Sequence, residues 1–140
     1  MNISWITGKI GLSGSIDNYN QLVDERITAV INVREQQDDI VELSNRGIAY
    51  YWFPIPDHSA PRSDQINAFI QLTERLAHDG EKILVHCAVG RGRSAMLVML
   101  YLIIHDGWTD KKAHDFVIGI RPSVALTKMQ HEKLTSYLEE

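Results

Sequence analysis

Apolar residues in this chain follow two alternating patterns. The first consists of short runs rich in β-branched and aromatic residues, which are typical of strands buried in a sheet. Proline gives no N–H to a strand ladder, so Pro54 and Pro56 are expected to end the longest of these runs. The predicted strands lie at 29–33, 48–55 and 83–85, with a further short hairpin or strand at 5–10.

Between these runs, apolar residues recur every three or four positions, which is typical of helices that bury one face. The clearest example is formed by Ala113, Phe116, Val117 and Ile120, just before Pro122. The predicted helices lie at 19–26, 41–46, 64–78, 93–105 and 113–120, with a last one after residue 127.

Residues that start and stop helices flank several of these segments. The tripeptide His-Asp-Gly occurs at 78–80 and 105–107. A glycine just past a helix, with a histidine near its negative pole, predicts a helix end at both places. Ser63 or Asp64 is expected to cap the third helix, and the Thr-x-x-Gln spacing at 127–130 has the pattern of a capping box.

The order of the elements determines the fold class. Strands separated by helical segments favour a mostly parallel sheet with helices on both faces, so the fold class is α/β. Everything after Cys87 is predicted to be helical, so the sheet should not extend further. At 140 residues, the chain is expected to form one domain spanning 1–140.

Composition narrows the function classes. Hydrophobic residues make up 44% and charged residues 23%, which is ordinary for a globular protein, and the net charge of −4 argues against general nucleic-acid binding. The longest apolar run, 95–104, is half the length of a membrane span and predicts a core helix. A single cysteine and an N-terminus without a secretory pattern lead us to expect a cytoplasmic location.

That cysteine lies in the stretch ILVHCAVGRGRSAML, residues 83–97, between a predicted strand and a predicted helix. One interpretation starts from Gly90, Gly92 and Ala95, which match the G-x-G-x-x-A fingerprint of dinucleotide-binding oxidoreductases. That class needs a further strand ending in an acidic residue roughly 20 positions later. The chain is predicted to stay helical there, and Cys87 is left unexplained, so this alternative is remote.

The other interpretation starts from Cys87, which is separated from Arg93 by a five-residue loop that opens a helix. Backbone N–H groups in such a loop converge on an anion, and a thiolate there has a depressed pKa. Arg93 can grip two phosphate oxygens, and Ser94 can donate its hydroxyl to the departing thiolate. A buried structural cysteine is the simpler alternative, but it leaves these neighbours unexplained. The expected phosphate-binding residues are Ala88, Val89, Gly90, Arg91, Gly92 and Arg93.

The pattern His86-Cys87-x-x-Gly90-x-x-Arg93-Ser94 resembles the signature of the cysteine-dependent protein tyrosine phosphatase superfamily. Further stretches resemble its small atypical dual-specificity phosphatases, the VHZ-like branch. These stretches are Ser4-Trp5, Gly8-Lys9-Ile10, Ile55-Pro56-Asp57, Pro61, Asp64-Gln65-Ile66 and Ile120-Arg121-Pro122. The resemblance implies a sheet of four or five strands, a phosphocysteine intermediate, no metal and no cofactor.

The chain departs from this pattern at two positions. Ala95 stands where the family usually has glycine, and Arg91 adds a charge inside the loop. In this second respect, the loop also resembles those of phosphatases that act on phosphoinositides or phosphatidylglycerophosphate. The departure leaves the substrate class open between phosphorylated proteins, small phosphomonoesters and phospholipids.

The resemblance also implies roles for residues outside the loop. Asp57 stands where the family carries its general acid, although it could also organise the turn after Pro56. Asp64 is the rival acid but is expected to cap a helix, and His86 is expected to hydrogen-bond the loop. Gln130 could position the hydrolytic water or simply complete the capping box.

Three further polar residues are expected near the loop. Arg121 is expected to pair with acidic groups beneath the loop, with a second substrate phosphate as the alternative. Asn32 and Arg34 should support loops at the carboxyl edge of the sheet. The histidines outside the signature show no metal-ligand spacing, so no metal site is expected.

Together these features predict a phosphomonoester hydrolase in which Cys87 is the nucleophile, Arg93 binds the phosphate and Asp57 is the acid. The expected substrates carry phosphotyrosine, with phosphoserine and phosphothreonine as further candidates. A catalytically inactive phosphate-binding protein is the remaining class, but the cysteine, the arginine, the serine and the candidate acid are all present, so the sequence does not support it. The protein is expected to be a monomer that binds no nucleic acid and does not span a membrane.

Overall fold

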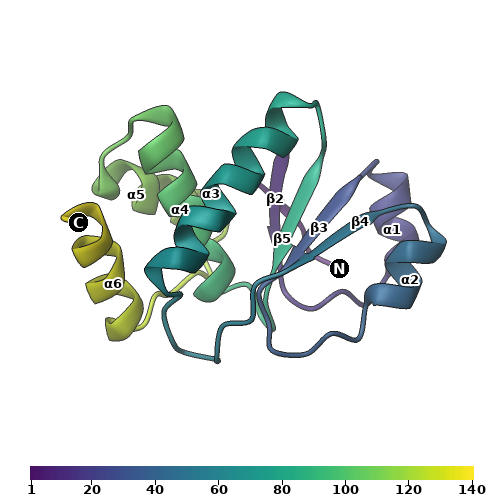
Figure 1. The fold of residues 1–140 in the computed structure, drawn as a ribbon, viewed down its shortest axis with the longest axis horizontal. Coiled ribbons are helices and arrows are strands. Elements are labelled where there is room, and N and C mark those ends of the chain that lie inside the picture. The colour runs from purple at the N-terminus through teal and green to yellow at the C-terminus, as the bar shows by residue number, and fades with distance from the viewer.

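The predicted apolar runs form a five-stranded sheet with the strand order β1-β2-β5-β3-β4 (Figure 1). In this computed structural model, which describes residues 1–140, β1 pairs antiparallel with β2 and every other pair is parallel. The expected α/β fold with a mostly parallel sheet is therefore confirmed. The strands are β1 Ser4–Trp5, β2 Ile10–Ser13, β3 Ala29–Asn32, β4 Ala49–Trp52 and β5 Ile83–His86.

Four of the six helices cover the two faces of this sheet, and the other two pack outside them. Helices α1 and α2 lie on one face, whereas α3 and α4 lie on the other, with α5 and α6 packed against α4 (Figure 1). The two helices that close on His-Asp-Gly end as predicted, because Gly80 and Gly107 adopt φ of +79° and +72°. The helices are α1 Tyr19–Asp24, α2 Ile40–Asn45, α3 Ser63–His78, α4 Arg93–Asp106, α5 Asp110–Ile120 and α6 Lys128–Leu138.

Successive side chains along a strand point to opposite faces of the sheet, so each strand contributes to the cores on both faces. Val30 and Leu84 belong to the smaller core under α1 and α2, whereas Ile31 and Val85 belong to the larger core under α3 and α4. Helix α4 is buried from Arg93 to Leu102 because it lies between the sheet and three other helices. Its surroundings explain why the apolar run shows no polar face. None of the helices has the length and apolar character needed to cross a membrane.

Two strand predictions needed correction. The N-terminal hairpin exists, but β2 begins only at Ile10 and continues to Ser13 alongside β5. Gly11 interrupts the apolar signal there, and a Cβ at this position would lie 3.0 Å from the Trp5 ring. Strand β4 ends at Trp52, short of the predicted residue 55, because two prolines follow and its partner β3 also ends.

The predicted cap of α3 was wrong. The helix already begins at Ser63, so Arg62 occupies the N-cap position and no side chain there accepts a capping hydrogen bond. Asp64 instead pairs with the Arg62 guanidinium, with 3.0 Å between Oδ1 and Nε. Gln65 completes the helix start by accepting the Arg62 N–H through Oε1 at 3.0 Å.

The elements after β5 decide against a dinucleotide fingerprint. Only helices follow this strand, so the second strand that such a fingerprint requires does not exist. Within the sheet, strand β5 occupies the central position, between β2 and β3. The loop after β5 therefore opens at the centre of the carboxyl edge, where open α/β sheets bind ligands.

Candidate active site

The single cysteine lies at the start of the phosphate loop (residues 87–93), which connects β5 to α4. Cys87 is only 2% exposed, and its N–H donates to the carbonyl of Ser13 on β2. Gly90 has a φ of +75°, and a Cβ there would lie 2.8 Å from the Ser13 backbone. Glycine is therefore required at this position for the loop to curl back over the end of the sheet.

Two hydrogen-bonding groups lie next to the Cys87 sulfur. Ser94 Oγ lies 3.1 Å from Sγ, and the Gly90 N–H donates to Sγ at 3.1 Å. Burial by itself raises the pKa of the Cys87 thiol, but these hydrogen bonds and the charge of Arg93 outweigh it and lower the pKa below its ordinary value. The site therefore favours a thiolate, which is the nucleophilic form of cysteine.

Arg93 connects the phosphate loop to the acid loop (residues 54–62), which runs from the end of β4 to the start of α3. Its Nη1 donates to the Ile55 carbonyl at 2.8 Å, and its Nη2 lies 3.4 Å from Asp57 Oδ1. Asp57 thus stands beside the arginine that is predicted to bind phosphate. The rival Asp64 is exposed and paired with Arg62, so the structure brings only one of the two candidate acids to the site.

These groups open into one cavity of about 230 Å³. It brings together the predicted nucleophile, the arginine, the acid and Gln130, although Ala88 does not line it. The Ala88 carbonyl instead accepts the N–H of Ser15 at 2.9 Å, away from the cavity. The lining residues are Asp57, His58, Cys87, Val89, Arg91, Gly92, Arg93, Ala125, Thr127 and Gln130.

The expectation that His86 hydrogen-bonds the phosphate loop was wrong. Its ring is fully buried and neither nitrogen has a hydrogen-bond partner. Burial lowers the pKa of His86 to about 4, against the opposing charge of Asp39, whose Oδ2 lies 3.5 Å from Nε2. The imidazole is therefore neutral near pH 7 and forms part of a buried polar layer beneath the loop.

Asp39, which sequence reasoning missed, is the centre of this layer. It is 2% exposed and accepts hydrogen bonds from the Tyr19 hydroxyl and from Arg34 Nη2, the latter at 3.0 Å. Asn32 supports the same segment, because its Oδ1 accepts the Arg34 N–H at 2.8 Å. Asn32 and Arg34 thus have the structural role expected of them, but the segment they support is 33–39. The only signal in the sequence was the polar run that follows β3.

Arg121 lies under the phosphate loop as predicted, but its partners are different. Its guanidinium donates to the carbonyls of Gly90 at 3.2 Å and Val89 at 3.3 Å, and to Ser4 Oγ at 3.1 Å. No carboxylate pairs with it, so the expected acidic partners were wrong. Burial lowers the pKa of Arg121, and the nearby Cys87 thiolate opposes this shift. These bonds hold two loop carbonyls on the side away from the cavity.

The capping box at the start of α6 is confirmed. Thr127 Oγ1 accepts the Gln130 N–H at 3.2 Å, and Gln130 Oε1 accepts the Thr127 N–H at 2.9 Å. The buried Gln130 side chain also packs against Gly92, where an added Cβ would lie 2.4 Å from Oε1. Its role in positioning water stays a prediction. No three His, Cys, Asp or Glu side chains in the structure gather as metal ligands would.

Comparison with protein-family models matches residues 13–140 to "Dual specificity phosphatase, catalytic domain". Dual specificity protein phosphatase 18 of Mus musculus is 31% identical over 96% of this chain and 72% of its own length. The phosphatidylglycerophosphate phosphatase PTPMT1 of Arabidopsis thaliana is 36% identical over 56% of this chain. The tyrosine-protein phosphatase CDC14 of Candida albicans is 28% identical over 78% of it. The matched regions span only 23% and 20% of these last two proteins.

Solved structures give the same result for the fold. The crystal structure of Tk-PTP in the active form superposes with a TM-score of 0.89 at 27% identity, covering 99% of this chain and 97% of that one. The crystal structure of human DUSP28 gives a TM-score of 0.86 at 24% identity, covering 98% and 93%. The chain therefore shares its fold with both of these solved structures.

Proposed function

The chain belongs to the dual-specificity phosphatase family, and from that premise we propose that it hydrolyses phosphomonoesters through a phosphocysteine intermediate on Cys87. The observation that carries this proposal is the convergence on one cavity of Cys87, Arg93 and Asp57. The donors around the sulfur support the thiolate, and the arginine lies beside the acid.

In the proposed first step, the Cys87 thiolate attacks the phosphorus atom. A sulfur–phosphorus bond forms while the bond from phosphorus to the leaving oxygen breaks. Arg93 and the N–H groups of the phosphate loop stabilise the charge on the phosphoryl oxygens. Asp57 donates a proton to the leaving oxygen, which departs as an alcohol or phenol.

In the proposed second step, water attacks the phosphocysteine. The Asp57 carboxylate accepts a proton from this water, the sulfur–phosphorus bond breaks and inorganic phosphate is released. Ser94 Oγ, 3.1 Å from the sulfur, donates to the thiolate as it departs. Gln130 has a second Nε2 hydrogen that could orient the water, since only one donates to the Ser59 carbonyl.

The proposed substrates are proteins that carry phosphotyrosine, together with phosphoserine and phosphothreonine. A second candidate class is phospholipids, and Arg91 is the observation that favours it. Arg91 is exposed, lines the cavity and pairs with no carboxylate, so it could bind a second anionic group. The matched relative from Arabidopsis thaliana is itself named a phosphatidylglycerophosphate phosphatase.

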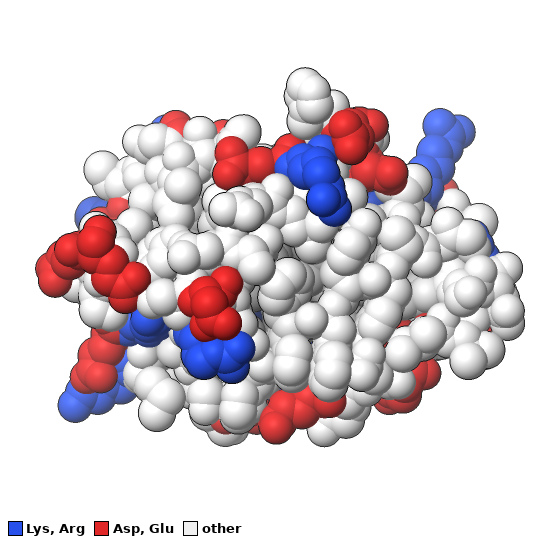
Figure 2. Space-filling view, in the orientation of Figure 1, with Lys and Arg blue, Asp and Glu red and all other residues white.

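The remaining proposals concern the setting of the enzyme. We propose a cytoplasmic monomer that works without a metal or a cofactor and does not bind nucleic acid. The net charge of −4 supports the last point. On the face seen in Figure 2, acidic and basic side chains are scattered without a continuous basic surface.

The experiment is a substrate panel measured with the wild type and with Cys87→Ser as the blank. The panel contains an aryl phosphate, phosphotyrosine, phosphoserine and phosphothreonine peptides, phosphoinositides and phosphatidylglycerophosphate. Turnover of the aryl phosphate by the wild type alone supports the proposed chemistry, and its absence contradicts it. The preferred substrate is the one with the highest kcat/KM, and Arg91→Ala should lower kcat/KM selectively for doubly charged lipids if they are preferred.

A further inference from the structure

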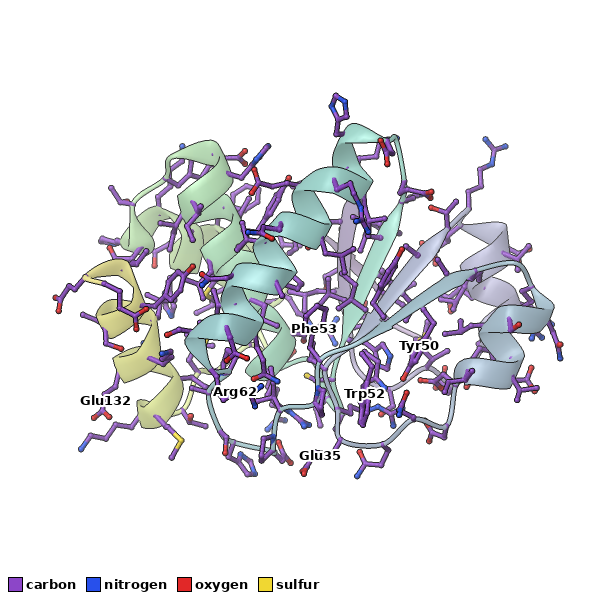
Figure 3. The ribbon with its side chains drawn as sticks, viewed as in Figure 1. Glu35, Tyr50, Trp52, Phe53, Arg62 and Glu132 are labelled. Atoms are coloured by element: carbon purple, nitrogen blue, oxygen red, sulfur yellow. The ribbon has the colours of Figure 1, made fainter.

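The acid loop is held by hydrogen bonds to its carbonyl groups from three helices. The loop begins after the labelled Trp52 and Phe53 and ends at the labelled Arg62 (Figure 3). Four of its carbonyls accept a bond from a side chain outside the loop. The pairs are Gln65 Nε2 to Pro54 at 2.9 Å, Arg93 Nη1 to Ile55 at 2.8 Å, Thr127 Oγ1 to His58 at 2.9 Å and Gln130 Nε2 to Ser59 at 3.1 Å.

Two of these donors occupy the same position in different helices. Gln65 and Gln130 are each the third residue of their helix, where a side-chain oxygen accepts the N–H of the N-cap residue. Both side chains are nearly buried. Capping uses only the amide oxygen, and a glutamate would serve equally well. The amide nitrogen is therefore the part that needs explaining, and in both helices it donates to the acid loop.

Thr127 has the same double use. Its Oγ1 accepts the Gln130 N–H, which is the capping bond, and its hydroxyl donates to the His58 carbonyl. His58 has a φ of +65°, a conformation that a residue with a Cβ adopts only where the surroundings hold it. The adjacent Asp57 carboxylate accepts the His58 N–H at 2.9 Å, so the position of this residue also fixes that of the carboxylate.

We propose that Gln65, Thr127 and Gln130 are positioning residues for Asp57. Their donors hold the acid loop over the cavity before a substrate binds, so that the Asp57 carboxyl group is ready to protonate the leaving oxygen. The inference rests on the proposed role of Asp57 as the general acid. It assigns to the two helix starts a second task, separate from capping, that acts on proton transfer.

The test separates donation from capping. Thr127→Asp keeps an acceptor for the Gln130 N–H but has no hydroxyl to donate to His58. Gln65→Glu likewise keeps the acceptor for Arg62 and loses the donor to Pro54, and it lies outside the cavity. Thr109→Asp is the matched control, since Thr109 caps α5 through Lys112 and does not contact the acid loop. Thermal unfolding of each variant shows whether it is folded.

The measurement is kcat/KM on phenyl phosphate, a poor leaving group, and on an aryl phosphate with a strongly acidic phenol. The ratio of interest is kcat/KM on phenyl phosphate divided by kcat/KM on the substrate with the acidic phenol. Thr127→Asp should lower this ratio roughly tenfold, which is part of the 10²–10⁴ that a positioned acid supplies. Gln65→Glu should lower it less, Thr127→Ser should restore the wild-type ratio, and Thr109→Asp should leave it unchanged. In Asp57→Asn, adding Thr127→Asp should cause no further fall in the ratio.

Several results would overturn the inference. An equal fall on both substrates would show that the new charge acts on phosphate binding rather than on the acid. An unchanged ratio in both Thr127→Asp and Gln65→Glu would show that the donors do not matter. If Asp57→Asn itself leaves the ratio unchanged, the inference also falls, but through the proposed function, because the wrong acid was assigned.

Discussion

The phosphate loop and the acid loop contribute to the same cavity but are built in different ways. The phosphate loop provides the nucleophile, the backbone donors and the arginine from the consecutive residues 87–93, between a central strand and a buried helix. The acid loop provides one carboxylate, and side chains from three separate helices hold its carbonyls. One loop is specified by adjacent residues, and the other by contacts between residues distant in the sequence.

The two loops also have different parts in the proposed reaction. Attack and charge stabilisation belong to the phosphate loop and are needed for every phosphomonoester. Proton donation belongs to the acid loop and matters in proportion to the basicity of the leaving oxygen. Changes in the first loop should therefore affect all substrates alike, whereas changes in the second should depend on the leaving group.

The largest effect is expected for Cys87→Ser, which should abolish turnover on every substrate. The serine hydroxyl is a far weaker nucleophile, but the loop amides that bind the anion are unchanged. The Cys87→Ser variant should therefore still bind phosphate or vanadate, as measured by calorimetry. Activity above about 1% of the wild-type rate would rule out Cys87 as the nucleophile, since losing a covalent nucleophile costs orders of magnitude.

Arg93→Lys should weaken both binding and kcat, because a point charge cannot replace the planar guanidinium. We expect a loss of about 3–5 kcal/mol in transition-state stabilisation, as for removing a preorganised charged group. Most of the loss should be independent of the leaving group, as measured by kcat/KM on the two aryl phosphates. A wild-type kcat/KM would mean that the loop amides bind phosphate without help.

Asp57→Asn should show the opposite selectivity. On phenyl phosphate, kcat should fall by roughly 10²–10⁴, the usual contribution of one positioned acid. With a strongly acidic phenol as the leaving group, the loss should be much smaller. The matched control is Asp64→Asn, which changes an exposed carboxylate outside the cavity and should alter neither rate. The acid is misassigned if the Asp64 variant shows the steeper dependence on leaving-group pKa.

His86 allows a test of the polar layer beneath the phosphate loop. Its pKa is about 4 in the folded protein against an ordinary 6.5. The unfolded chain therefore binds more protons in this range, so the free energy of unfolding should fall as the pH drops from 6.5 towards 4. This fall in the free energy of unfolding should be of order 3 kcal/mol, because one pKa unit corresponds to about 1.36 kcal/mol. Urea unfolding of the wild type and His86→Gln measures it, and equal pH dependence in both would contradict the assignment.

The sequence predicted the local features well. The helix ends at Gly80 and Gly107, the capping box at 127–130 and the strand-loop-helix around Cys87 each depend on residues close together in the chain, and each is present. The sheet was predictable as a class because strands and helices alternate. Its order was not, because strand pairing depends on packing between distant segments.

Although the cap of α3 was a local error, several other errors concern contacts between distant residues. Arg121 was expected to meet carboxylates, but its partners are backbone carbonyls, which no side-chain pattern reveals. Asp39 reaches His86 only because β3 and β5 are neighbours in the sheet. Gln65 and Gln130 were predictable as helix-start residues, whereas their second bonds to the acid loop depend on how α3 and α6 pack.

Catalysis is proposed to proceed through a phosphoryl group on the Cys87 sulfur. The most direct measurement is rapid denaturing quench of the wild type during turnover of an aryl phosphate, followed by mass spectrometry of the peptide that contains Cys87. We expect one added phosphoryl group on the Cys87 sulfur during steady turnover, with none in Cys87→Ser. Steady turnover with an unmodified Cys87, or with the phosphoryl group on another residue, would contradict this proposal.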